Sequence, residues 1–322
     1  MDRNDYETLH AELLRSEPDA LIHPHRFAHK AMATVFEVVC VHEDRSYAGQ
    51  AARAVFDLLD RLESELTCHR SSSDIFRINS LKPGETTSVG QWTMECLLLA
   101  RHFHRQTGGA FDISLGSGLD KVELNPAALR VRVHAGNVRL DLGGIGKGYA
   151  VDRAGELLEE WGICQALVHG GFSSVLALDA PPGRDGWPLT ISLPAPGPAP
   201  LLLRVTARRH CWSASGIRKK DHIVDPRTGV PVRNRAAVWV SGAVDSLAAA
   251  FPRGDPAAVP AGIFETGGSP SAVAEALSTA FMIMTLDEIA DLCRKYPGIE
   301  ARVLTSDPDN PSGPHLLTSF TR

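Results

Sequence analysis

Four glycines, one lysine and two aspartates fall within the twelve residues from Asp141 to Asp152. Residues 138–142 predict a strand, and the apolar residues of 149–161 recur with the 3.6-residue period of an amphipathic helix. The glycines therefore lie in a turn between a strand and a helix. Such a turn lets a ligand approach the backbone, and it places free amide groups and the positive end of the helix dipole beside a phosphate. Lys147 adds a full positive charge.

The glycine spacing matches neither of two standard phosphate-binding patterns. A Walker A loop ending at Lys147 would have glycine in place of Asp141 and Ser or Thr in place of Gly148, and the Rossmann spacing is also absent. Taken locally, two interpretations stay open. The segment is either a phosphate-binding turn or a tight strand-to-helix turn that needs glycine for its geometry alone.

Strands and helices are predicted in irregular alternation, without a βαβ repeat. This mixture favours an α+β fold over a doubly wound parallel sheet. Short apolar runs predict strands at 34–41, 166–168, 175–178, 189–193, 201–205, 237–240 and 301–304, and helical periodicity predicts helices at 51–66, at 92–105, from 270 onward and at 287–296.

Three segments far from the glycine-lysine turn in the sequence bear on which interpretation holds. They are Thr107-Gly-Gly-Ala-Phe-Asp112, Asp221-His-Ile-Val-Asp-Pro-Arg-Thr-Gly-Val-Pro-Val232 and Ala276-Leu-Ser-Thr-Ala-Phe281. In this order the four segments resemble those of the FAD:protein FMN transferase family, also called ApbE-like flavin transferases. Weaker matches at 32–36 and 66–70 extend the resemblance, which runs from about Phe27 to the end of the chain.

The resemblance implies an α+β fold and a defined reaction. The pyrophosphate of FAD is cleaved, FMN passes to a threonine hydroxyl of a target protein, and AMP leaves. Such phosphoryl transfer needs positioning, a hard cation and a base for the nucleophile. FAD is then the substrate, Mg²⁺ the cofactor, and an unidentified acceptor protein the partner. We expect one large domain of this type over residues 27–322, an N-terminal extension over 1–26 and a loop insertion at 242–268.

The resemblance assigns the metal to an oxygen-donor set of the kind that Mg²⁺ prefers. Thr279 matches the family's threonine, Glu275 stands where aspartate is usual, and the backbone carbonyl would come from Gly146. A spacing of four residues puts Glu275 and Thr279 on one helix face. Without the resemblance, Glu275 would be read as a solvated helix residue and Thr279 as a packing residue.

His222 matches the histidine of the family's most specific motif. The resemblance implies a general base toward the acceptor hydroxyl or a contact to the phosphate, and histidine titrates near neutral pH. Asp225 either orients His222 or caps the turn that follows. The resemblance assigns the FAD pocket to Met32, His69, Gly109, Ala110, Phe111, Asp112, Lys147, Asp152, Ser215 and His222.

Two of these pocket residues have alternative interpretations. Phe111 either packs on a flavin or adenine ring or belongs to the core. Asp152 either binds a ribose or adenine edge or interacts favourably with the helix dipole. The chain also departs from the family at His69, where tyrosine is frequent, and at Phe172, where aspartate often follows two glycines.

Composition limits the classes of partner. A net charge of −5 without a long Lys/Arg block argues against a nucleic-acid partner. Six scattered cysteines form no C-x-x-C pair, which argues against a zinc site. We find no apolar stretch of membrane-spanning length and no secretory signal in the acidic residues 1–24, so we expect a cytoplasmic protein without a membrane span.

The sequence leaves two alternatives to transfer. The same metal site would serve an FAD pyrophosphatase that gives FMN and AMP with water as acceptor. A non-catalytic FAD-binding protein of the same fold would bind FAD and leave it intact.

Overall fold

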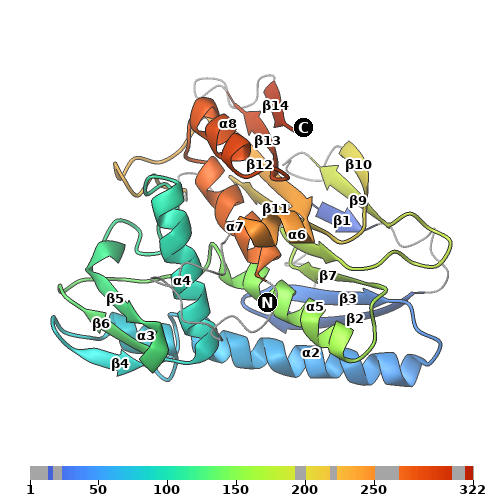
Figure 1. Ribbon diagram of the computed structural model, residues 1–322, viewed down its shortest axis with the longest axis horizontal. Helices are drawn as coiled ribbons and strands as arrows, with labels where there is room; N and C mark the ends of the chain where they lie inside the picture. The colour runs from blue at the N-terminus through green and yellow to red at the C-terminus, as the bar shows by residue number, and fades with distance from the viewer. Residues whose placement is uncertain are drawn as a thin grey trace, which may run out of the picture.

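A computed structural model describes residues 14–16, 24–192, 201–217, 223–250, 268–306 and 316–321. Its centre is an eight-stranded sheet in which each neighbouring pair is antiparallel, in the order β14-β13-β12-β11-β8-β7-β3-β2 (Figure 1). The strands are β2 (His25–Ala31), β3 (Thr34–Cys40), β7 (Ala166–Gly170), β8 (Ser174–Ala177), β11 (His210–Gly216), β12 (Arg235–Ala243), β13 (Glu300–Thr305) and β14 (Leu316–Phe320).

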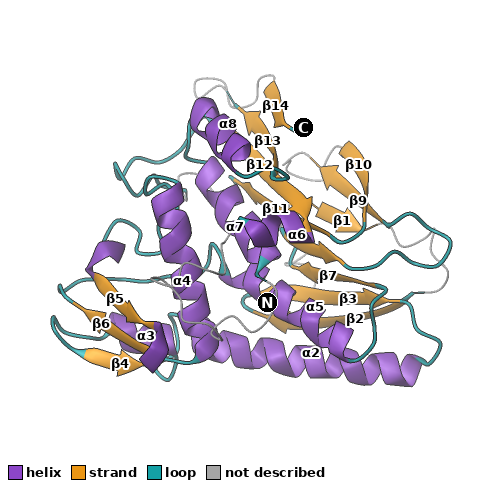
Figure 2. Ribbon diagram, in the orientation of Figure 1, coloured by secondary structure: helices purple, strands orange, loops and turns teal. Residues whose placement is uncertain are grey.

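Helices cover one face of this sheet (Figure 2). α5 (Gly146–Glu160) packs on β7 and β8, and α7 (Pro270–Phe281) packs on β11 and β12 and against α5. α2 (Arg45–Leu66) lies against α5 and β2, and α6 (Val244–Ala249) lies against α7. The helix layer therefore brings the first turns of α5 and α7 together in front of the central strands.

The other face of the sheet is covered by a three-stranded sheet in the order β1-β9-β10. It comprises β1 (Leu14–Ser16), β9 (Trp187–Ser192) and β10 (Leu201–Ala207). The two-residue period of β12 divides its side chains between the two layers: Val238 and Val240 enter the core under the helices, and Ala237 and Trp239 enter the core under the small sheet.

A third sheet stands to one side, on the left of Figure 1. Its order is β4 (Thr86–Ser88), β6 (Arg130–Val133) and β5 (Val122–Asn125). α3 (Asp74–Asn79) and α4 (Gln91–Gln106) join it to the main body, because α3 contacts β4 and α4 contacts both β5 and α7.

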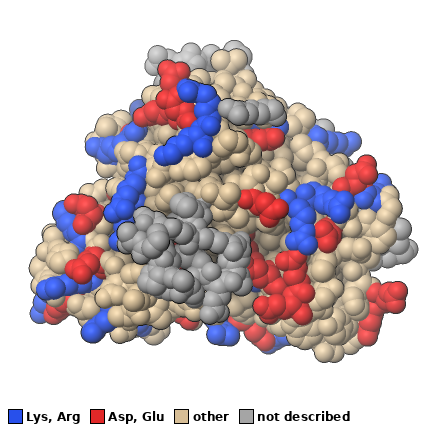
Figure 3. All heavy atoms as spheres, viewed as in Figure 1, with Lys and Arg blue, Asp and Glu red and all other residues tan. Residues whose placement is uncertain are grey.

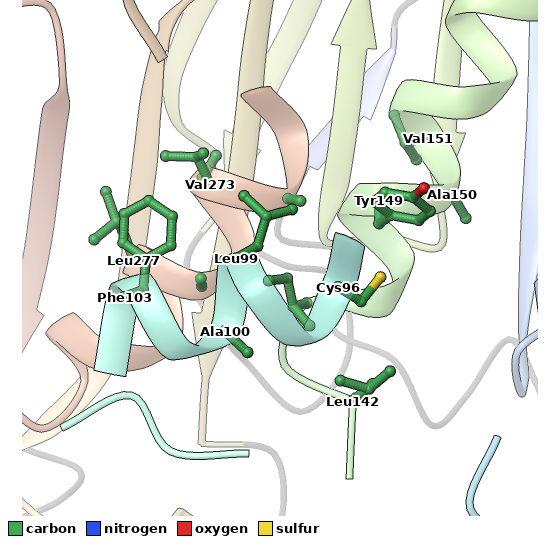
Figure 4. Close-up of a cluster of buried hydrophobic side chains, with 14 of the residues drawn as sticks. Cys96, Leu99, Ala100, Phe103, Leu142, Tyr149, Ala150, Val151, Val273 and Leu277 are labelled. Atoms are coloured by element: carbon green, nitrogen blue, oxygen red, sulfur yellow. The ribbon is translucent and has the colours of Figure 1, made fainter. Parts of the chain in front are cut away.

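α4, α5 and α7 meet in a buried cluster (Figure 4). Phe103 of α4, Tyr149 of α5 and Leu277 of α7 are fully buried there. α7 is buried at every position except Thr279, as expected for a helix that is apolar nearly all round. Thr279 is therefore the side chain through which α7 reaches solvent.

The α+β prediction is confirmed, and all but one of the predicted helices and strands are present, with α2 beginning six residues before its predicted start. The strand expected at 138–142 is wrong. This segment is extended, but its backbone bonds go to loops: the Leu140 N–H donates to the Asn79 side chain at 2.7 Å, and the Asp141 N–H donates to the Ile113 carbonyl at 2.8 Å. The helix after the glycines begins at Gly146 rather than Tyr149.

Several elements span the predicted segment boundaries. β1 lies inside the expected extension and pairs with β9, and the boundary between 26 and 27 falls within β2. Residues 242–250 of the expected insertion form the end of β12, helix α6 and its C-terminal cap. Residues 251–267 lie outside the described residues.

The last helix is α8 (Leu286–Lys295), and it begins with a capping box between Thr285 and Glu288.

Two surface properties complete the description. Lys and Arg side chains lie among Asp and Glu side chains on the face viewed in Figure 3, and neither sign dominates it. Within the described ranges, no helix has both the length and the apolarity that crossing a bilayer requires.

Candidate functional site

A cleft of about 520 Å³ opens beside the first turn of α5. Its walls come from the loop after α4, the glycine-lysine turn, the turn between β7 and β8, the end of β11, residues 223–226 and the C-terminal end of α7, so distant parts of the sequence meet there. It is lined by Ala110, Phe111, Asp112, Ile113, Leu115, Asp141, Gly143, Gly144, Lys147, Ser173, Ala214, Ser215, Gly216, Ile223, Val224, Pro226, Thr279 and Ile283.

The glycine-rich turn is closed by the side chain of Asp141 and by one backbone bond. Asp141 accepts a hydrogen bond from the Gly143 N–H at 2.8 Å, and the Leu142 carbonyl accepts one from the Gly146 N–H at 2.8 Å. α5 begins at Gly146, so Lys147 lies in the first helical turn, where the helix dipole is positive. The turn therefore places Lys147 in this wall of the cleft.

Gly144 lets this turn approach two other motifs. A Cβ at this position would lie 3.2 Å from Cε2 of Phe111 and 3.6 Å from Oγ1 of Thr279. The absence of a side chain thus keeps the turn, the loop after α4 and α7 within contact of one another.

The first turns of α5 and α7 are joined by two buried carboxylates. Glu275 of α7 accepts the N–H of Gly148 in α5 at 2.6 Å. Asp152 of α5 accepts the N–H groups of Ser271 at 2.9 Å and Ala272 at 3.0 Å, at the start of α7. Each helix thus supplies carboxyl oxygens to the other's N-terminal turn, where the backbone amides lack partners within their own helix.

Backbone contact between these helices depends on Gly148. A Cβ there would lie 2.4 Å from the Ser271 carbonyl oxygen.

Asp152 is 3% exposed, and this burial raises the pKa of its carboxyl to about 7. The hydrogen bonds donated by Ser271 and Ala272 lower the pKa and oppose the effect of burial. The carboxyl of Asp152 is therefore used in holding α7 to α5.

Lys147 forms an ion pair with the second oxygen of Glu275. The ammonium donates to Glu275 Oε1 and also to the Gly143 carbonyl at 3.1 Å. The side chain of Glu275 is 5% exposed and that of Lys147 is 24% exposed. The carboxylate is thus buried behind the ammonium, and Lys147 is the partner that reaches the cleft.

Asp112 organises the loop opposite the turn. Its Oδ1 accepts from the N–H and the hydroxyl of Ser114 at 2.8 and 2.7 Å, and its Oδ2 accepts from the Gly116 N–H at 2.9 Å. These bonds hold Leu115 with φ of 51°, a left-handed conformation that is unfavourable for leucine. Leu115 is 71% exposed, so the loop presents an apolar side chain at the rim of the cleft.

The loop of Asp112 touches the turn of the histidine motif. A Cβ on Gly116 would lie 2.8 Å from the Pro226 carbonyl oxygen, so the two backbones are in contact. Asp225 closes that turn by accepting from the N–H of Arg227 at 2.9 Å, and it pairs with the Arg227 guanidinium. This pairing lowers the pKa of Asp225.

Hydroxyl groups connect α7 to the central sheet. Oγ of Ser215, near the end of β11, lies 3.0 Å from Oγ of Ser278 and 3.4 Å from Oγ1 of Thr279. The cleft therefore has a wall of neutral oxygen atoms beside Lys147.

Of the residues predicted for the site, six line the cleft: Ala110, Phe111, Asp112, Lys147, Ser215 and Thr279. Met32, His69, Gly109, Gly146, Asp152, Asp225 and Glu275 are not among its lining residues, and His222 lies outside the described residues.

Local contacts account for several of the residues away from the cleft. Met32 has φ of 50° in the turn between β2 and β3 and packs partly against the core. His69 lies 3.6 Å from the thiol of Cys68. A Cβ on Gly109 would lie 3.5 Å from the side chain of Arg227. Asp152, Asp225 and Glu275 are held by the partners described above.

The structure adds cleft residues that the predicted set omitted. Asp141, Gly143 and Gly144 lie in the predicted turn, and its glycine content is a sequence signal that points to them. Leu115 and Ser173 had no comparable signal, because their place depends on how loops from separate elements meet.

The oxygen donors at this site suit Mg²⁺ in their chemistry. Glu275 and Thr279 lie one turn apart on α7, and Gly146 begins the adjacent helix. Both oxygens of Glu275 are engaged, Oε1 by the ammonium of Lys147 and Oε2 by the Gly148 N–H, so a metal would take the place of the ammonium at Oε1. Among the described residues no cluster of three His, Cys, Asp or Glu side chains could hold a metal, so neutral oxygens would have to complete such a site.

Comparison with known proteins agrees with this arrangement. A FAD:protein FMN transferase of Treponema pallidum is 27% identical over 308 residues, which cover 80% of this chain and 77% of the relative. A FAD:protein FMN transferase of Salmonella typhimurium is 25% identical over 246 residues, covering 64% and 70%.

Solved structures share the fold. The apo form of the Pseudomonas stutzeri flavinyl transferase ApbE aligns with a TM-score of 0.73 at 22% identity, over 92% of this chain and 94% of that one. The flavin transferase ApbE of Vibrio cholerae aligns with a TM-score of 0.72 at 16% identity, over 92% and 97%. The sequence model of the ApbE family matches residues 32–251, which is more than half of the chain. The chain therefore belongs to the ApbE family.

Proposed function

We propose that the protein is an FAD:protein FMN transferase that uses Mg²⁺. The observation that carries the proposal is the convergence of three family motifs on one cleft, with Lys147, Phe111 and Thr279 among its lining residues. The relatives that bear this activity in their names support it, since the chain matches them over most of its length.

In the proposed reaction the threonine hydroxyl oxygen of the acceptor attacks the FMN phosphorus of FAD. A new P–O bond forms, the bond from that phosphorus to the bridging oxygen breaks, and AMP leaves with that oxygen. The acceptor proton passes to a base, for which His222 is the candidate. Lys147 is placed to neutralise the pyrophosphate, because it lines the cleft and carries a positive charge.

Thr279, Glu275 and the Gly146 carbonyl would hold the metal. Mg²⁺ supplies charge neutralisation at the phosphates when it is bound. The chain's own residues set its position: α7 fixes Glu275 and Thr279 one turn apart, and the bond from Gly148 to Glu275 fixes α5 against them.

Asp112 and Phe111 would shape the flavin side of the cleft. Phe111 is 2% exposed and also belongs to the hydrophobic core, so it offers a rigid apolar surface rather than a mobile side chain. Leu115 at the rim would face the incoming acceptor or the outer part of the flavin.

Covalent transfer distinguishes this proposal from its alternatives. The purified protein is incubated with FAD, Mg²⁺ and a clarified lysate of the source cells, and proteins are separated under denaturing conditions and examined for flavin fluorescence. We expect a fluorescent band with the wild type and none with Thr279→Ala; Thr285→Ala, which alters a cap outside the cleft, is the matched control. FMN and AMP formed without any labelled protein would identify a pyrophosphatase, and intact FAD would identify a binding protein.

A further inference from the structure

The pairing of Lys147 with Glu275 has a consequence for cation binding. Glu275 is buried at the contact between α5 and α7, and both of its oxygens are engaged. Oε2 accepts a neutral backbone N–H from Gly148, whereas Oε1 accepts from the charged ammonium. Lys147 therefore supplies the full positive charge that stabilises this buried carboxylate.

Lys147 is the movable member of the pair. Its side chain is 24% exposed and lines the cleft, and its long flexible stem allows the ammonium to move without a change in the backbone. Glu275 is confined by α7, in which all residues except Thr279 are buried. A second cation can approach Oε1 only if the ammonium leaves, because two positive charges at one oxygen repel each other.

We propose that Lys147 is an internal counter-cation that competes with the divalent metal for Glu275. The inference rests on the metal site in the proposed function and adds an exchange to it. When the metal binds Glu275 and Thr279, the ammonium leaves Oε1 of Glu275, keeps its bond to the Gly143 carbonyl and turns toward the cleft, where it meets the pyrophosphate. Metal binding and the availability of Lys147 to the substrate are thereby coupled.

Direct metal binding tests this exchange without any turnover. The full-length protein, free of flavin, is titrated with Mn²⁺ as a probe for the divalent site, with bound metal followed by electron paramagnetic resonance. Lys147→Met removes the charge and keeps the apolar stem. We expect Mn²⁺ to bind this variant about tenfold more tightly than the wild type, the scale on which one nearby unit charge acts at a partly buried site.

Three further variants complete the design. Lys82→Met removes the same charge from an exposed position away from the cleft, and we expect wild-type affinity. Glu275→Gln removes the shared carboxylate and should abolish Mn²⁺ binding. Lys147→Gln repeats the neutralisation with a polar side chain, so it serves if Lys147→Met leaves too little folded protein by circular dichroism.

The outcomes separate the inference from the proposed function. Tighter binding in the neutral Lys147 variants, with loss of binding in Glu275→Gln, supports the exchange. Unchanged or weaker binding in those Lys147 variants, with binding still lost in Glu275→Gln, overturns the exchange and leaves the metal site in place. Wild-type affinity in Glu275→Gln overturns both the exchange and the proposed metal ligand.

Discussion

Gly148 is the position at which the packing of α5 on α7 can be tested most sharply. In Gly148→Ala the new Cβ would lie 2.4 Å from the carbonyl oxygen of Ser271, 2.6 Å from its carbonyl carbon and 2.8 Å from Cα of Ala272. All three are backbone atoms, so no side chain can rotate away. The first turns of α5 and α7 must separate.

Opposing effects determine how much Gly148→Ala changes the free energy of unfolding. Alanine favours a helix over glycine by about 1 kcal/mol. Overpacking costs about 1–3 kcal/mol, and loss of the charged hydrogen bond from Gly148 to Glu275 costs about 1.5–3 kcal/mol. We expect a net loss of about 2–4 kcal/mol, or about 5–10 °C in melting temperature.

Gly146→Ala is the matched control, two residues earlier in the same turn. Its Cβ would meet only Cβ of Leu142, at 3.9 Å, so we expect unchanged or slightly higher stability. The assay is thermal unfolding by circular dichroism of the wild type and both variants. Equal melting temperatures for Gly148→Ala and Gly146→Ala would refute the proposed backbone contact.

Two further predictions concern the supports of the cleft. Burial raises the pKa of Asp152 from 3.8 to about 7, so its stabilising contribution is full below about pH 4 and is lost as pH rises through 7. The free energy of unfolding of the wild type, relative to Asp152→Asn, should therefore fall between about pH 4 and pH 7 in urea titrations; a constant difference would contradict the burial argument. Asp112→Ala removes the acceptor for Ser114 and Gly116, and we expect FAD affinity, measured by flavin fluorescence, to fall about tenfold or more as the loop loses its left-handed turn. Wild-type affinity would show that the loop does not support the flavin.

The periodic part of the fold could be predicted from the sequence. The apolar periods of α2, α4 and α7 are long enough to be recognised. The start of α2 at Arg45, which Asp44 caps, lies six residues before the predicted start, because the first turn carries no apolar period. β11 was missed because residues 210–216 contain no Val, Ile or Leu, and their place in the sheet depends on pairing with β8 and β12. The segment at 138–142 was assigned to a strand because its composition fits one, although its partners are loops.

The site could be predicted only in part for a related reason. The spacing of Glu275 and Thr279 correctly places them on one helix, but α7 is buried, so only Thr279 reaches the cleft. Asp152 follows the glycine-lysine turn closely, so the sequence predicts that its charge stabilises the start of its own helix. The helix that it caps is nevertheless α7, which lies more than a hundred residues away in the sequence. Such cross-helix bonds leave no local pattern.

The central claim is that this cleft breaks the pyrophosphate of FAD. The most direct measurement is incubation of the purified protein with FAD, with and without Mg²⁺, followed by chromatography for AMP and for free and protein-bound FMN. We predict AMP only when Mg²⁺ is present, and none with Thr279→Ala. Intact FAD in the presence of Mg²⁺ and an added protein acceptor that another ApbE transferase labels would contradict the claim.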